Sequence, residues 1–225
     1  AGEKRRFPRG TGSPGTGNRS SSRAPPWPWT GSEGISVGIR SFLAFELPVE
    51  IKKGVSAVSE DLKKSSLNAR WVKVENIHLT MVFLGHMAPE PLESIRERVG
   101  AVCQNHRPFE IIIQGLGVFG SKRHPRVLWM GLSGDVKRLA VFRDDLQDAL
   151  EPFGIKTEKR VFRPHLTLGR FRKGAGSTPD LGTLLSRFDT LTSPACLLEE
   201  LVLFRSDLLP GGAVYTPQGR WPLGP

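Results

Sequence analysis

Two copies of the tripeptide His-Leu-Thr, at 78–80 and 165–167, combine residue types that could do chemistry. Each copy holds an imidazole, whose unperturbed pKa of about 6.5 allows proton transfer near neutral pH, and a hydroxyl that can donate a hydrogen bond. Cleavage of a phosphodiester needs a base for water, an acid for the leaving alkoxide and donors for the phosphoryl oxygens. Two copies acting on one phosphate would supply all of these groups.

Both tripeptides occur in apolar runs typical of β-strands. Successive side chains of a strand point to opposite faces, so the histidine and the threonine of each tripeptide share a face. If an approximate twofold axis relates the two strands, they bring two imidazoles and two hydroxyls to one cleft. We therefore interpret His78 and His165 as catalytic candidates, and Thr80 and Thr167 as candidates for binding the phosphate.

A single histidine on a strand is more often a hydrogen-bonded structural residue than a catalyst. The repetition favours catalysis, because two of the five histidines stand in the same tripeptide and a Leu-Gly pair follows each. His86, His106 and His124 lack this context, and we expect them to be solvated or loop residues. No Asp, Glu or Cys stands at ligand spacing beside either tripeptide, so we expect neither a metal nor a cofactor.

The elements around the tripeptides recur in the same order along the chain. Residues 127–132 align with 42–47, both as strands that lead into a helix with one apolar face and then into a His-Leu-Thr strand. We predict an α+β fold of two pseudo-symmetric lobes from an internal repeat, with antiparallel sheets lining a central cleft and helices outside. The predicted strands are 41–45, 70–73, 77–84, 109–118, 127–132, the strand at 165, 197–204 and 213–216. One predicted helix begins at residue 48, and the other three cover 91–105, 139–150 and 181–185.

Composition indicates an ordinary globular protein. The 225 residues include 38% hydrophobic and 24% charged residues, and no apolar run is long enough for a membrane-spanning helix. Residues 1–38 are rich in Gly, Ser, Pro, Thr and Arg, so we expect a disordered N-terminal extension followed by a single bilobal domain at 39–225. Cys103 and Cys196 lie far apart in apolar surroundings, and we expect two buried thiols in a cytoplasmic protein.

The net charge of +10 favours a polyanionic partner. We expect several basic residues to lie at the edge of the cleft, where they could contact backbone phosphates without reading bases. Arg126 is the strongest candidate, because it immediately precedes the first strand of the second repeat. A solvated charged face is the alternative for each of them. The others are Lys73, Lys122, Arg123, Arg160 and Arg163.

The segments around these motifs resemble the bacterial and archaeal RNA 2′,3′-cyclic phosphodiesterases, the 2′-5′ RNA ligase-like branch of the 2H (two-histidine) phosphoesterases. The resemblance extends from about residue 40 to residue 223, and only the N-terminal extension lies outside it. The two His-x-Thr motifs are specific in combination, whereas either alone would be weak. The matching segments are RWVK at 70–73, IHLTMVFLG at 77–85, PRVLW at 125–129, FRPHLTLGR at 162–170, LFRS at 203–206 and PGGAVY at 210–215.

This resemblance implies metal-independent hydrolysis of a terminal RNA 2′,3′-cyclic phosphate to a 2′-phosphate, with a reversible ligation that forms 2′-5′ linkages. Expected substrates are RNA ends, tRNA fragments among them, and the expected state is a monomer. The resemblance assigns His78 as general acid toward O3′ and His165 as base toward water, although the pseudo-symmetry leaves their order open. It further implies that Thr80 and Thr167 bind phosphoryl oxygens, that Phe83 stacks on the terminal base and that Arg170 contacts the phosphate or the attacking water.

Strict strand alternation conflicts with two of these roles. Phe83 and Arg170 each follow their histidine by five residues, which would place them on the face opposite the catalytic pair. The strands must therefore bend or end there, and Gly85 and Gly169 favour such an irregularity. In straight strands, Phe83 would be a core residue and Arg170 an outer one.

Two other functions remain open at this point. The first is a non-catalytic RNA-binding module with the same fold, which the loss of a histidine or threonine would have favoured; both motifs are intact. The second is a 2H phosphoesterase that acts on small cyclic nucleotides or on ADP-ribose cyclic phosphates, because the size of the pocket is not visible in the sequence.

Overall fold

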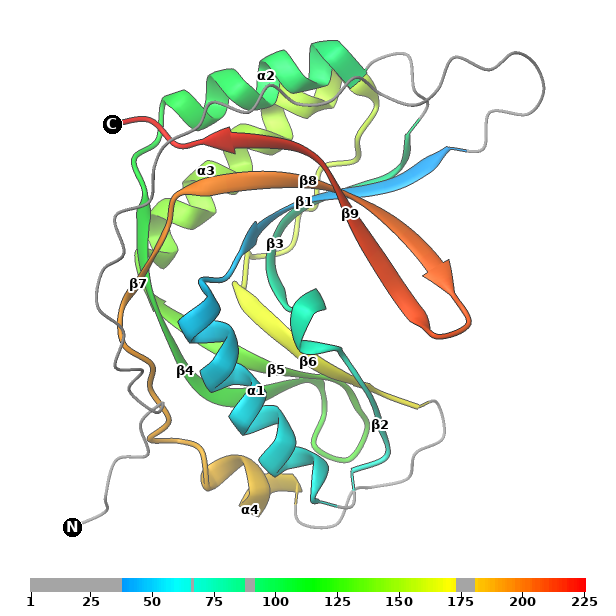
Figure 1. Cartoon of the computed structure of the whole chain (residues 1–225), viewed down its shortest axis with the longest axis vertical. Coiled ribbons are helices and arrows are strands. Elements are labelled where there is room, and N and C mark those ends of the chain that lie inside the picture. Colours follow the sequence, from blue (N-terminus) through cyan, green and yellow to red (C-terminus); the bar gives the residue numbers. More distant parts are fainter. Residues whose placement is uncertain (1–37, 66, 88–91, 173–180) are drawn as a thin grey trace.

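A curled antiparallel sheet of nine strands forms the frame of the computed structural model (Figure 1). The structure describes residues 38–65, 67–87, 92–172 and 181–225, so the predicted disordered extension lies outside it except for Gly38. The strands are β1 (Ile39–Glu46), β2 (Ala69–Trp71), β3 (His78–Met87), β4 (Phe109–Gly120), β5 (Pro125–Gly134), β6 (His165–Phe171), β7 (Cys196–Leu198), β8 (Glu200–Leu209) and β9 (Gly212–Pro222). The helices are α1 (Val49–Lys63), α2 (Leu92–Gln104), α3 (Val136–Leu150) and α4 (Leu181–Ser186), with short 3-10 helices η1 (Val74–Asn76) and η2 (Glu151–Phe153).

The sheet has two halves that meet at the His-Leu-Thr strands. Its order is β7-β4-β5-β6-β3-β1-β8-β9, with β2 also paired to β6, and a single registered pair, Leu79 with Leu166, joins β3 to β6. The α+β prediction is confirmed, and the two predicted sheets are halves of one. The halves exchange strands: β4 follows the first repeat in the chain but pairs with β5, whereas β8 follows the second repeat and pairs with β1.

Strand register supports the internal repeat residue by residue. The sequence alignment of 127–132 with 42–47 makes β5 the equivalent of β1, and β6 the equivalent of β3. Each aligned residue indeed meets the corresponding partner on the next strand. In the first repeat the pairs are Phe42 with Phe83, Ala44 with Thr80 and Glu46 with His78; in the second they are Val127 with Arg170, Trp129 with Thr167 and Gly131 with His165.

The helices α1 to α4 cover one face of the sheet, because each has one apolar stripe to bury. On α1 the predicted stripe of Ile51, Val55, Val58 and Leu62 is buried, and residues of α2, α3 and α4 join the same core as the leucines of both His-Leu-Thr strands. The other face carries a separate cluster. It consists of Phe42, Ala44, Val202 and Phe204, with Tyr215 packed against them.

The prediction of a single strand at 197–204 is wrong, because this segment belongs to two strands. Leu198 ends β7 in the pairing with β4, and Glu200 begins β8 in the pairing with β9, so Glu199 separates the two strands. Two glutamates, Glu199 and Glu200, interrupt the apolar run at this point, and the chain passes here from one half of the sheet to the other. The sheet must therefore curl far enough to bring its β7 end close to β8, as the continuous orange ribbon in Figure 1 shows.

The expectation of two buried thiols also needs correction. Cys103 is buried but Cys196 is only half-buried; both thiols are free, and burial raises their pKa values to about 12 and about 11. His106 lies in a loop as expected, but it is not solvated, because its Nε2 lies 2.8 Å from Asp145 Oδ2 and its ring packs edge-on against Phe142. Within the described ranges, no helix is long and apolar enough to cross a membrane.

Candidate active site

A β-bulge in each His-Leu-Thr strand sets which side chains face the cleft. In β3, Val82 pairs with Leu43 and Thr80 with Ala44, so Met81 is an extra residue; Leu168 is the extra residue at the equivalent place in β6. One extra residue shifts the alternation of faces by one. The same order of burial follows in both strands, with two buried residues in succession and then an exposed one. Phe83 and Arg170, the exposed ones, therefore share a face with the histidines and threonines.

Backbone carbonyl groups hold both imidazoles in the same orientation. His78 Nδ1 lies 2.8 Å from the carbonyl oxygen of Asn76, and His165 Nδ1 lies 2.7 Å from that of Arg163. A carbonyl oxygen can only accept, so Nδ1 carries the proton in each ring and Nε2 is left for a ligand. Each histidine is thus oriented by the residue two positions before it, and the two are set up identically.

Aromatic side chains flank both imidazoles. Phe42 stacks on His78 with ring centroids 4.7 Å apart, and Tyr215 meets the same imidazole edge-on at 5.3 Å. Phe119 approaches His165 edge-on at 4.7 Å, and Trp129 lies at 6.4 Å. These rings pack against the imidazoles and contribute to their burial.

Burial keeps both imidazoles neutral near neutral pH. It lowers the pKa of His78 from 6.5 to about 4, against an opposing effect of the hydrogen bond to Asn76, and the charges of Lys52 and His165 lower it as well. Burial also lowers the pKa of His165, and the charge of Arg170 adds to this effect. The pairing of Leu79 with Leu166 places the two histidines on adjacent strands, each next to one member of this pair. A bound phosphate anion would favour the protonated form of either ring.

The lowered pKa of His78 predicts how stability depends on pH. Between about pH 6.5 and about pH 4, the imidazole takes up a proton in the unfolded chain but not in the folded protein, so acidification favours unfolding. Above this pH window, protonation of His78 has no effect on the free energy of unfolding, and below it the loss of stability no longer changes with pH. We expect urea denaturation to show a smaller loss of stability between about pH 7 and about pH 4.5 in His78→Asn than in the wild type. The exposed His86→Asn variant is the control, and equal losses in all three proteins would contradict the prediction.

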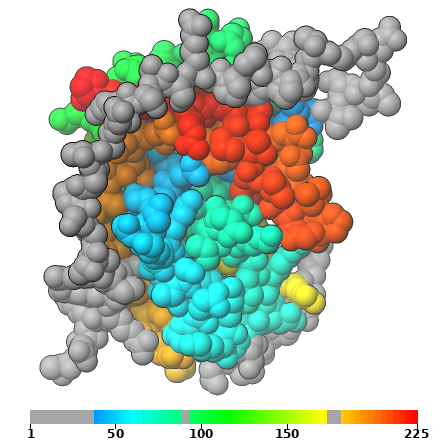
Figure 2. Space-filling model, in the orientation of Figure 1, coloured from blue at the N-terminus to red at the C-terminus, as the bar shows by residue number. Residues whose placement is uncertain are grey.

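Asn76 connects His78 to the β8–β9 hairpin. Its carbonyl oxygen accepts from the imidazole, and its side-chain Nδ2 donates to the carbonyl oxygen of Ala213 at 2.8 Å. In Figure 2 the red and orange atoms of the hairpin adjoin the green-cyan atoms of the segment around η1 and β3. A cavity of about 400 Å³ lies between them. It is lined by Glu46, Lys73, Glu75, Asn76, Ile77, His78, Phe204, Ala213, Val214, Tyr215 and Pro217.

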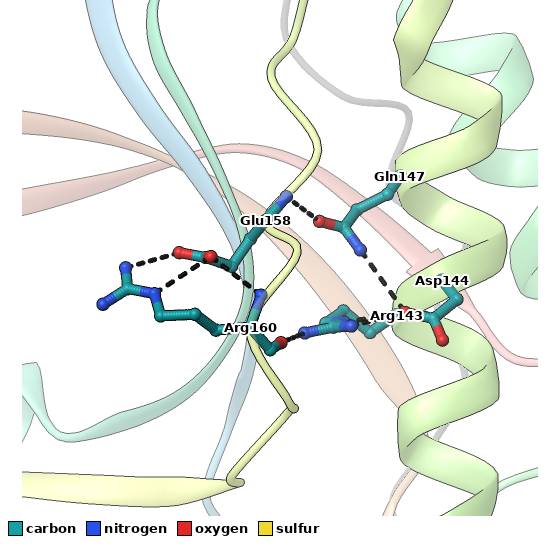
Figure 3. A network of polar contacts seen from close by, with 5 residues as sticks. All are labelled: Arg143, Asp144, Gln147, Glu158 and Arg160. Carbon is teal, nitrogen blue, oxygen red and sulfur yellow. Dashed lines mark hydrogen bonds and ion pairs between the residues drawn. The ribbon is translucent and has the colours of Figure 1, made fainter.

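A polar network fixes the loop that leads into His165 (Figure 3). Gln147 of α3 accepts a hydrogen bond from the Glu158 amide at 2.6 Å, and Arg143 donates to the carbonyl oxygen of Arg160 at 3.2 Å. The guanidinium of Arg143 also lies over the ring of Phe162 at 5.1 Å. Arg160, which is expected among the basic residues at the cleft edge, forms an exposed ion pair with Glu158.

The expected binding residues differ in how closely they approach the histidines. The ring of Phe83 is 62% exposed and lies 6.2 Å from that of Phe42, which stacks on His78. Arg170 is exposed next to the His165 side of the site. Arg126 is exposed at the start of β5, beside an irregularity in the pairing of β4 with β5, and contacts neither histidine in the described part of the chain. Nor do three or more His, Cys, Asp or Glu side chains gather there as a metal site would require.

Comparison with known proteins identifies the family. The model of the 2′-5′ RNA ligase superfamily matches residues 49–208. The chain belongs to this superfamily. It is similar to the RNA 2′,3′-cyclic phosphodiesterase of Methanothermobacter thermautotrophicus, with 33% identity over 79% of this chain and 95% of that protein. The RNA 2′,3′-cyclic phosphodiesterase of Thermotoga maritima is 30% identical over 79% of this chain and 91% of its own length.

Solved structures agree with this assignment to the 2′-5′ RNA ligase superfamily. E. coli LigT in complex with 3′-AMP superimposes with a TM-score of 0.66 and 26% identity, over 83% of this chain and 98% of LigT. The protein TT0787 of Thermus thermophilus has the same TM-score at 24% identity, over 82% of this chain and 98% of that chain, which supports the fold alone.

Several residues around the histidines of this superfamily member were not found from the sequence. The sequence indicates Phe42 only as a strand residue, and Trp129 and Tyr215 only as members of matching segments, with no role beside a histidine. The alignment of the repeats held a usable signal, since it sets Ala44 against Trp129 at the position beside each threonine. Space for Trp129 depends on Gly117, because a Cβ there would lie 2.3 Å from the indole ring. In the second repeat the indole of Trp129 thus fills the position beside the threonine, where the first repeat has only the small Ala44.

Proposed function

We propose that this protein hydrolyses terminal RNA 2′,3′-cyclic phosphates to 2′-phosphates by acid and base catalysis without a metal ion. The proposal rests chiefly on two equivalent imidazoles, each bound through Nδ1 to a carbonyl group and each accompanied by a hydroxyl on the same face. The curated relatives named RNA 2′,3′-cyclic phosphodiesterase and the LigT complex with 3′-AMP support the class of substrate.

In the proposed reaction, water attacks phosphorus in line with the departing O3′. Nε2 of His165 takes the proton of the water, and the protonated Nε2 of His78 gives a proton to O3′ as the phosphorus–O3′ bond breaks. Thr80 and Thr167 donate hydrogen bonds to the non-bridging oxygens as their charge increases. The cavity of about 400 Å³ beside His78 supports this order, because a nucleoside that carries the leaving oxygen would find room there. Phe119 and Trp129 restrict the space beside His165.

The same steps would allow ligation. An RNA 5′-hydroxyl in place of water would lose its proton to His165, attack phosphorus and leave a 2′-5′ phosphodiester, while O3′ takes the proton of His78. The reverse reaction returns the cyclic phosphate. Fragments of tRNA with 2′,3′-cyclic ends are suitable substrates for either direction.

The proposal predicts that the purified protein, treated with EDTA, opens an oligonucleotide 2′,3′-cyclic phosphate and yields only the 2′-phosphate. Phosphorus NMR distinguishes the two monoester products. A 3′-phosphate product would reverse the assignment of the leaving oxygen, and activity that returns only with added metal would contradict the metal-free mechanism. Hydrolysis of cyclic mononucleotides without any hydrolysis of RNA would favour the small-molecule alternative.

A further inference from the structure

We infer that Arg70 and Arg170 form a second phosphate site, which holds the internucleotide phosphate on the 5′ side of the reacting nucleotide. The site would favour RNA ends over cyclic mononucleotides, because a mononucleotide lacks that phosphate. This inference rests on the proposed function and specifies its substrate. Arg70 has no role in the reaction as described so far.

Strand pairing places the two arginines side by side. Arg70 of β2 is in register with Arg170 of β6, and registered residues of antiparallel strands project to the same face. Their neighbours face the core: Trp71 packs against it, and a Cβ on Gly169 would meet the side chains of Trp71 and Ala69 at 3.4 and 3.5 Å. Arg70 therefore projects to the cleft face with Arg170.

The pair lacks a compensating negative charge. Like charges directly opposite on a sheet destabilise it, and both side chains are exposed. In the described part of the chain, neither guanidinium has a carboxylate partner, whereas Arg143, Arg160, Arg205 and Arg220 each have one. Guanidinium groups bind phosphate oxygens in a two-pronged geometry, so a phosphate diester would relieve the repulsion.

The position of the pair suits a flanking phosphate. Arg170 lies close enough to the reactive centre for its charge to lower the pKa of His165. Arg70 lies one strand further from Thr167 than Arg170 does, since β2 pairs with β6 on the side away from β5. The reacting phosphate between the histidines and the phosphate at the arginine pair would thus be neighbours along one chain.

The test compares Arg70→Ala with the wild type on two substrates. One is a dinucleotide that ends in a 2′,3′-cyclic phosphate and holds one internucleotide phosphate; the other is the cyclic mononucleotide. We expect KM for the dinucleotide to rise about tenfold with kcat nearly unchanged, and both constants for the mononucleotide to stay the same. Arg70→Lys keeps the positive charge but lacks the two-pronged guanidinium, so its KM for the dinucleotide should lie between those of the wild type and Arg70→Ala. Arg98→Ala on the outer face of α2 removes the same charge and should leave KM and kcat unchanged for both substrates.

An equal loss on both substrates would overturn the inference, because Arg70 would then act on the reacting phosphate or on the fold. No loss on the dinucleotide would overturn it as well. Calorimetric binding of the dinucleotide 2′-phosphate provides a readout that needs no turnover, and Arg70→Ala should weaken it about tenfold. If the wild type cleaves neither substrate, the proposed function fails, and this binding measurement still decides on the phosphate site.

Discussion

Replacing either His78 or His165 by alanine is expected to lower kcat on an RNA 2′,3′-cyclic phosphate by about 10²- to 10⁴-fold. Each variant removes one of the two proposed proton-transfer groups, and among the described residues His106 cannot replace it, since His106 is paired with Asp145. The double variant should be little worse than either single one, because in the proposed reaction the two groups act in one concerted step. Initial rates at saturating substrate measure the effect.

His124→Ala is the matched control, because this exposed histidine lies in the loop between β4 and β5. It should retain the wild-type rate. Full activity in both His78→Ala and His165→Ala would refute the mechanism. A tenfold loss in one and a much larger loss in the other would instead show that water can replace one of the two roles.

The second large effect is expected at the threonines. Thr80→Val and Thr167→Val keep the shape of the side chain but remove the hydroxyl, and loss of one such donor to a developing oxyanion costs about 10²- to 10³-fold in kcat. Each threonine lies on the cleft face between its histidine and the bulge, so the change leaves the strand pairing in place. Thr80→Ser and Thr167→Ser, which retain the donor, should recover most of the activity.

Thr183→Val on α4, where the hydroxyl is exposed and away from the cleft, should leave kcat unchanged. A rise in KM with kcat preserved in Thr80→Val or Thr167→Val would show that the hydroxyl binds the ground state and the transition state equally. That outcome would contradict a role in charge stabilisation.

Local pattern is sufficient to predict most elements and the central site. Each helix carries an apolar stripe at helical spacing, as in Leu139, Phe142, Leu146 and Leu150 of α3, and all four of these are buried. The two His-Leu-Thr strands are identical in their first three residues, so their equivalence is visible in the order of the amino acids alone. Such patterns involve only residues that are close together in the chain, so they can be recognised from the sequence alone.

Features that depend on long-range pairing were not predictable. The bulges at Met81 and Leu168 arise from the register with β1 and β5, and only that register shows that Phe83 and Arg170 face the cleft. Likewise, the break at Glu199 reflects a change of pairing partner rather than a change in residue type. The partners of charged groups are equally invisible in sequence, which is why the pattern shows neither the ion pair of Arg160 with Glu158 nor the position of Arg70 opposite Arg170.

The exchange of β4 and β8 between the halves of the sheet constrains how the chain can fold. β1 lies between β3, which is close in sequence, and β8, which is made near the end of synthesis, as in the pair of Phe42 with Phe204. Contacts between such distant segments form slowly, because a long loop must close first. On the ribosome, β1 would therefore keep one edge unpaired until almost the whole chain has emerged. Until then that edge could pair with another nascent chain, so neither repeat can mature independently of the other.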